Sequence, residues 1–93
     1  MIIVKQDKKG IVNFDNVTDI YVDKKEDGNR YFVLYIPVSN LEGIDILGEY
    51  ATEERAEEVL EEIIEKYENI QLLKYSRESL ATRDNFIYRM SKE

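Results

Sequence analysis

Paired carboxylates are the residues of this sequence whose spacing comes nearest to a catalytic arrangement. Glutamates four residues apart, such as Glu57/Glu61 and Glu58/Glu62, would lie side by side on a helix. A two-carboxylate mechanism, however, needs one acid that is shielded from water, so that the two pKa values differ. The sequence also has no histidine and no cysteine, which removes the commonest general base and the thiolate nucleophile. We therefore predict that the protein is not an enzyme and has no catalytic residues.

Acidic residues around the polar stretch 24–29 are the nearest approach to a metal site. Asp19, Asp23, Glu26 and Asp27 offer the oxygen ligands that hard cations prefer. Their spacing does not match a calcium-binding EF-hand loop, so we interpret them as part of a solvated acidic loop. The four glycines are dispersed and form no phosphate-binding loop. We expect no metal, no cofactor and no small-molecule substrate.

The stretch from Thr52 to Tyr67 is the element around which the rest of the chain is organised. Its apolar residues recur with the spacing of one helix face. The Thr52 side chain can accept a hydrogen bond from the first turn, and the glutamates that follow suit the positive end of the helix dipole. We predict a long amphipathic helix whose buried face consists of Ala56, Val59, Leu60, Ile63, Ile64 and Tyr67.

Short β-prone runs precede this helix and are separated by turn-forming residues. The predicted strands cover residues 2–4, 11–14, 18–23, 31–38 and 44–50. The fold class that follows is α+β: an antiparallel β-meander of about five short strands packed by one long amphipathic helix, with a C-terminal extension ending in a short strand. We expect residues 1–75 to form a single α+β domain, and residues 76–93 to form a C-terminal extension that packs on the same or a second protomer.

Two local features accompany this prediction. Gly48, near the end of the last strand before the helix, is expected at a β-bulge or at a close approach to the helix. After Tyr67 the helical pattern weakens, and Ile70, Leu72 and Tyr75 are compatible with a short strand.

The strand at residues 31–38 is apolar on both faces, and one helix can cover only one of them. We expect the helix to pack on Ile20, Val22, Leu34, Ile36 and Ile46. The opposite face would then be open, unless the C-terminal extension covers it within the same chain. An exposed apolar patch of this kind marks an interaction site. The predicted interaction residues of this sheet face are Tyr21, Tyr31, Val33 and Tyr35.

Nearly all of the net charge of −7 lies on the predicted helix. Residues 53–68 hold eight glutamates against Arg55 and Lys66, a net charge of −6, whereas residues 69–93 carry +2. Such a helix would repel phosphates, so we expect no nucleic-acid partner. The glutamates either form a solvated helix face or bind a basic protein surface. This acidic helix face consists of Glu54, Glu57, Glu58, Glu61 and Glu65.

Two segments, IVNFDNVTDIYV at residues 11–22 and ILGEYATEERAEEVLEEI at residues 46–63, carry a resemblance to known sequences. They resemble an uncharacterised family of small proteins from Gram-positive bacteria and their phages, over residues 2–64. The order of strands before a helix is also similar to that of small pleckstrin-homology-like domains, which have more strands than the prediction here. The resemblance implies the fold described above and a bacterial or phage setting. It assigns no activity and no site residues.

A protein–protein role is the function class that these exclusions leave. We predict a non-enzymatic interaction or assembly module that binds itself or another protein, with a homodimer formed through the C-terminal extension or the tyrosines of the sheet face. The alternative is a phage-like acidic inhibitor that presents the acidic helix face to a basic nucleic-acid-binding protein. No apolar run approaches the ~20 residues of a membrane span, and the lack of cysteine suits a reducing cytoplasm, so we expect a cytoplasmic protein. The contact residues predicted in the extension are Phe86, Tyr88 and Met90.

Overall fold

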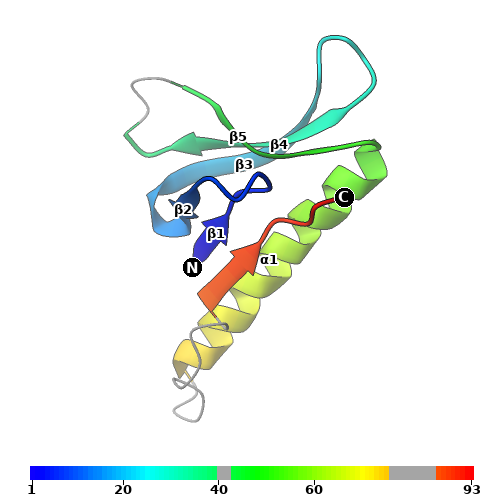
Figure 1. Cartoon of the computed structure of the whole chain (residues 1–93). Helices are drawn as coiled ribbons and strands as arrows, with labels where there is room; N and C mark the ends of the chain where they lie inside the picture. The colour runs from blue at the N-terminus through cyan, green and yellow to red at the C-terminus, as the bar shows by residue number, and fades with distance from the viewer. Residues whose placement is uncertain (40–42, 76–85) are drawn as a thin grey trace.

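The computed structural model of the chain describes residues 1–39, 43–75 and 86–93 (Figure 1). Within these residues the chain order is strands, one long helix, and a final strand. The elements are β1 (Ile2–Val4), β2 (Ile11–Asn13), the 3-10 helix η1 (Phe14–Asn16), β3 (Val17–Lys24), β4 (Tyr31–Pro37), β5 (Asp45–Tyr50), α1 (Glu53–Tyr75) and β6 (Ile87–Arg89). The predicted α+β class, the strands before the helix and the short C-terminal strand are confirmed.

The described strands form two sheets of three strands each. In the larger one β3, β4 and β5 are antiparallel, with β4 in the centre. In the smaller one β1 is central, antiparallel to β2 and parallel to β6. The pairing of Ile3 with Tyr88 shows that the last strand of the chain joins the first one. The meander is therefore present in β3–β4–β5, while β6 adds a parallel pair within the same chain.

One hydrophobic core lies between the two sheets and the helix. Figure 1 shows α1 and the β2–β1–β6 sheet on the same side of the β3–β4–β5 sheet. Ile3 of the small sheet, Val33 of the large sheet and Val59 of the helix are all fully buried in this core. The large sheet contributes side chains to this core from one face only. The register pairs Val33 with Val22 and Tyr35 with Ile20, and paired residues lie on the same face.

The first turn of α1 begins at the predicted cap. The backbone N–H of Arg55 donates to Oγ1 of Thr52 at 3.1 Å, which satisfies one of the free donors at the start of the helix. The glutamates that follow Thr52 are exposed. Thr52 is thus confirmed as the N-cap.

The far end of α1 differs from the prediction, because the helix continues beyond Tyr67 to Tyr75. The short strand predicted after Tyr67 was wrong. Ile70 follows Ile63 by two helical turns, so it extends the buried face of the helix, and it is itself buried. Ile70 therefore continues the buried face of the helix beyond Tyr67.

Gly48 lies at a bulge of β5, close to the ring of Tyr50. The ladder register shifts between Val33 and Leu34 of β4, which leaves Leu47 as the extra residue of β5. A Cβ atom on Gly48 would lie 3.0 Å from the Tyr50 ring, which is closer than ordinary van der Waals contact. The predicted bulge is confirmed, and the close approach is to Tyr50 rather than to the helix.

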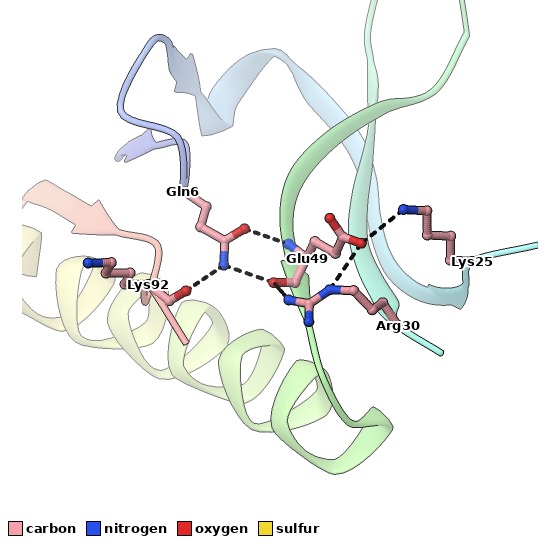
Figure 2. Close-up of polar contacts among 5 residues, drawn as sticks. All are labelled: Gln6, Lys25, Arg30, Glu49 and Lys92. Carbon is pink, nitrogen blue, oxygen red and sulfur yellow. Dashed lines mark hydrogen bonds and ion pairs between the residues drawn. The ribbon is translucent and has the colours of Figure 1, made fainter. Parts of the chain in front are cut away.

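Gln6, just after β1, joins the small sheet, β5 and the C-terminal segment (Figure 2). Its side-chain amide accepts a hydrogen bond from the backbone N–H of Glu49 at 2.7 Å and donates to the Glu49 carbonyl at 2.9 Å. The same NH₂ group donates to the carbonyl of Lys92 at 3.0 Å. The amide thus satisfies peptide groups of β5 much as a neighbouring strand would, which closes this edge of the large sheet.

Replacing Gln6 with leucine is expected to lower the free energy of unfolding by about 1–3 kcal/mol, because the Glu49 peptide group loses its partner. Gln6→Glu keeps the acceptor but turns its second carboxylate oxygen towards the carbonyls of Glu49, Ser91 and Lys92, so its loss should be at least as large. Urea denaturation of the three proteins measures both values. Equal stability of the leucine variant and the parent protein would mean that Gln6 does not hold the two sheets together.

Candidate interaction surface

Three of the four residues predicted to bind a partner through the sheet lie on the core face, so the prediction is corrected for Tyr31, Val33 and Tyr35. The fourth, Tyr21, lies on the opposite face. Val33 is 0% exposed and Tyr35 is 8% exposed, while Tyr31 packs half-buried against the core. The reason is the β3–β4 register, which places these three side chains on the same side as Ile20 and Val22. Ile20 and Val22 do pack against the core as predicted, but Leu34, Ile36 and Ile46 lie on the opposite face.

The opposite face of the large sheet is the one that carries an open apolar surface. Its side chains form cross-strand rows, which the ladder register defines. One row is Tyr21–Leu34–Ile46, and a second is Asp23–Phe32–Glu49. Ile36, opposite Asp19, completes the surface. We call this surface the outer face and define its apolar part as Tyr21, Phe32, Leu34, Ile36 and Ile46.

The outer face is tightly packed at its centre and open at its margin. Leu34 is only 7% exposed because its neighbours surround it, whereas Ile46 is 43% exposed. The adjacent Ile44 is also largely exposed. In the described part of the chain, α1 and the small sheet lie on the other side of β3–β4–β5 (Figure 1). A continuous apolar surface without a covering layer is typical of an interaction site.

The two long borders of the outer face differ in charge. On the β3 border, Asp19 and Asp23 are exposed acids. On the β5 border, the Glu49 carboxylate binds Nζ of Lys25 at 3.2 Å and Nε of Arg30 at 3.1 Å (Figure 2). Two cations thus share one carboxylate on this border, while Glu26 and Asp27 lie in the turn of the same β3–β4 hairpin.

The acidic helix face lies in solvent, as predicted for its position on the helix. All five of its members are exposed: Glu54, Glu57, Glu58, Glu61 and Glu65. Arg55 partly neutralises one end, since its guanidinium lies 3.0 Å from Glu58 and 3.6 Å from Glu62. These are surface ion pairs, which contribute little to stability. Whether this face binds anything stays a prediction.

The three C-terminal residues predicted at an interface lie within the fold of their own chain. Met90 is buried in the core, and Phe86 and Tyr88 are half-buried. The Tyr88 hydroxyl donates to the Glu62 carboxylate of α1 at 2.7 Å. Their contacts are intramolecular because β6 is held by β1. Packing on its own protomer is one of the two arrangements predicted for the extension, and a role of these residues in a dimer stays a prediction.

A polar cluster at the start of β5 is the other group of ionisable side chains that the fold brings together. The Asp45 carboxylate accepts from Nζ of Lys5 and from the Tyr35 hydroxyl, both at 3.1 Å. The backbone N–H of Ile46 and then the Lys5 ammonium lower the pKa of Asp45. Every member has a partner, so the cluster is structural. Among the described residues, no group of three or more acids is arranged to hold a metal ion.

Burial raises the pKa of Tyr50 to about 12. Its ring is almost fully buried, and its hydroxyl donates to the Ser91 carbonyl at 2.7 Å. A folded-state pKa above the unfolded value means that the folded protein holds this proton more tightly. The resulting stability is present below the unfolded pKa near 10 and is lost as the pH rises towards 12.

We therefore expect the free energy of unfolding to fall by roughly 2–3 kcal/mol between pH 10 and pH 12 on account of Tyr50. In Tyr50→Phe the fall should be clearly shallower. A smaller slope remains there because burial and the bond to Glu62 also raise the pKa of Tyr88. Denaturant titrations at several pH values measure the slopes, and identical slopes would contradict this account of Tyr50.

Comparison of the chain with protein-family models, with curated proteins and with solved structures finds no match. The resemblance to small proteins of Gram-positive bacteria and phages therefore stays a prediction. No helix in the described residues is long and apolar enough to cross a membrane.

Proposed function

We propose that this protein is a non-enzymatic interaction and assembly module, and that its outer face binds a second copy of the chain. The observation that carries the proposal is the row Tyr21–Leu34–Ile46, an apolar strip across all three strands of a sheet. In the described residues, both the helix and the small sheet pack on the other face of that sheet (Figure 1). Burying such a strip against an identical one removes apolar surface from water in both chains.

The charges at the two borders favour a second copy over an unrelated partner. A twofold axis parallel to β4 would place the β3 border of one chain over the β5 border of the other. The row Asp23–Phe32–Glu49 then faces its own copy in reverse order, so Asp23 lies opposite Glu49 of the second copy and near Lys25 and Arg30, the two cations that bind that Glu49. Opposite charges at matching positions set the register of an interface. Face-to-face packing of two sheets is also a common way to build a core.

The other parts of the proposal rest on composition. The absence of histidine and cysteine supports a role without catalysis. We place the protein in the cytoplasm because a chain without cysteine suits a reducing compartment.

The alternative is an acidic inhibitor of a basic nucleic-acid-binding protein. Its support is the exposure of the acidic helix face, defined above, on the side of α1 away from the core. We rank it second because exposed glutamates are common on solvated helices, whereas an uncovered apolar sheet face is uncommon.

Light scattering on the full chain tests the dimer directly. We expect the mass of two chains at high protein concentration, and the mass of one chain for Ile46→Lys, which puts a charge into the apolar strip. Ile11→Lys is the matched control, since Ile11 of β2 is 68% exposed and lies off the outer face. A monomeric parent protein, or an Ile46→Lys variant that dimerises as well as Ile11→Lys, would contradict the proposal.

A further inference from the structure

A groove runs between β3 and the middle of α1, away from the centre of the outer face. Its walls include Val17, Thr18, Asp19 and Ile20 of β3, and Leu60 and Ile64 of α1. Successive side chains of a strand point to opposite faces. The ladder to β4 shifts register between Val17 and Asp19, so the groove follows an edge that is bulged at Thr18 and regular from Asp19 onward. We call it the β3–α1 groove.

The edge of β3 that borders this groove is open. β3 is an end strand of its sheet, and no strand among the described residues pairs with its outer side. The opposite end of the sheet is different, because the Gln6 amide binds both peptide groups of Glu49 there. An edge strand has alternate N–H and C=O groups that point outward and can accept a further strand. The fold thus closes one edge and leaves the other available.

The side chains of β3 define which strand would fit. Towards the core side it presents Ile20 and Val22, next to the exposed Ile64 of the helix. On the other side it presents the exposed acids Asp19 and Asp23. A strand lying beside β3 would place its own alternate residues next to these two sets. Aliphatic residues suit the first set and basic residues suit the second.

The helix adds to the same charge preference. Leu60 lines both the β3–α1 groove and a shallow depression among the glutamates of the acidic helix face, among them Glu57 and Glu61. The groove is therefore mainly apolar, with Asp19 on its β3 wall and the acidic helix face beyond Leu60.

We propose that the β3–α1 groove binds an extended peptide segment in which basic and aliphatic residues alternate, and that this segment adds to β3 as a further strand. Main-chain hydrogen bonds to the edge of β3 supply affinity in this mode, and alternate side chains supply specificity. The aliphatic residues contact Ile20 and Ile64, and the basic residues contact Asp19 and Asp23. The site shares Asp19 and Asp23, on the β3 border, with the proposed dimer surface, while its contacts to Ile20 and Ile64 lie on the other side of the strand.

The probe is an end-blocked peptide of alternating lysine and valine, as long as the 8 residues of β3. Titration into the full-length, isotopically labelled protein is followed by NMR. We expect the amide signals of β3 and of Ile64 to shift and those of Glu49 to stay in place. The same peptide with glutamate in place of lysine should bind at least roughly tenfold more weakly. Methylation of the peptide nitrogens on the edge that pairs with β3 should abolish binding.

Protein variants separate this site from the rest of the surface. The double change of Asp19 and Asp23 to asparagine is expected to weaken binding roughly tenfold, whereas Asp27→Asn in the hairpin turn is the matched control and should have no effect. Ile46→Lys should bind the peptide as well as the parent protein, even though it prevents the proposed dimer.

Three results would overturn the proposal. The first is the absence of shifts at β3, or shifts on the outer face instead. The second is equal binding of the methylated or the glutamate peptide. The third is movement of the β3 signals with protein concentration in Ile46→Lys, which lacks the proposed outer-face dimer, because a second copy would then occupy this edge.

Discussion

Replacing Val33 with aspartate is expected to lower the free energy of unfolding by about 3–5 kcal/mol or more, since it leaves an unpaired charge in the core. Val33 is 0% exposed in the central strand of the large sheet. A loss of that size is comparable to the whole stability of a typical small domain. The variant should be largely unfolded at neutral pH, as measured by circular dichroism and urea denaturation.

The control for this change is Ile46→Asp on the outer face, for which we expect a loss of roughly 1 kcal/mol or less. A milder variant, Val33→Ala, should cost roughly 2 kcal/mol and gives a measurable value if the aspartate variant does not fold. If Ile46→Asp were the more damaging of the two aspartate variants, the assignment of the core face would be reversed.

Ile63→Ala is expected to cost about 2–5 kcal/mol, because it opens a cavity where the helix meets the sheet. Ile63 is 1% exposed, and its neighbour Ile64 is 41% exposed. Ile64→Ala should therefore cost roughly 1 kcal/mol or less. Urea denaturation measures the loss of unfolding free energy in each variant, and the difference between the two tests which face of the helix meets the sheet. Equal losses would be inconsistent with the observed packing.

The sequence predicted the fold class because the strongest signals are local. The apolar period from Ala56 to Ile63 places a helix regardless of its neighbours, and the hydroxyl of Thr52 marks where it begins. The end of the helix was missed because the spacing of Ile70 and Leu72 also suits a strand. In the fold Ile70 is buried on the same helix face as Ile63, whereas Leu72 is exposed. The pairing of β6 with β1 joins the two ends of the chain, and no local pattern reports such a contact.

The candidate interaction surface was placed on the wrong face of β4, and the reason is physical. β4 is apolar on both sides, so its own pattern does not say which side is buried. The pairing of β3 with β4 decides which side is buried. Lys24 pairs with Tyr31 at the hairpin, so two residues further along Val22 pairs with Val33. β3 has a clear apolar side, so counting the pairs back from the hairpin turn assigns Val33 to the core.

The acidic helix face could be read from the sequence because exposure follows directly from helical spacing. Its partner could not, since glutamates that bind a surface and glutamates that only bind water have the same pattern. The β3–α1 groove was also beyond the sequence, because it combines an open strand edge with Leu60 and Ile64 of a distant helix turn.

The central claim is that the outer face points away from the core and is covered by a second copy of the chain. The protein has no cysteine, so a single cysteine introduced at Ile46 reports on this face alone. We predict that its rate of thiol labelling falls as protein concentration rises, while a cysteine introduced at Ile11 is labelled at the same rate throughout. A labelling rate at position 46 that is independent of concentration would contradict the claim.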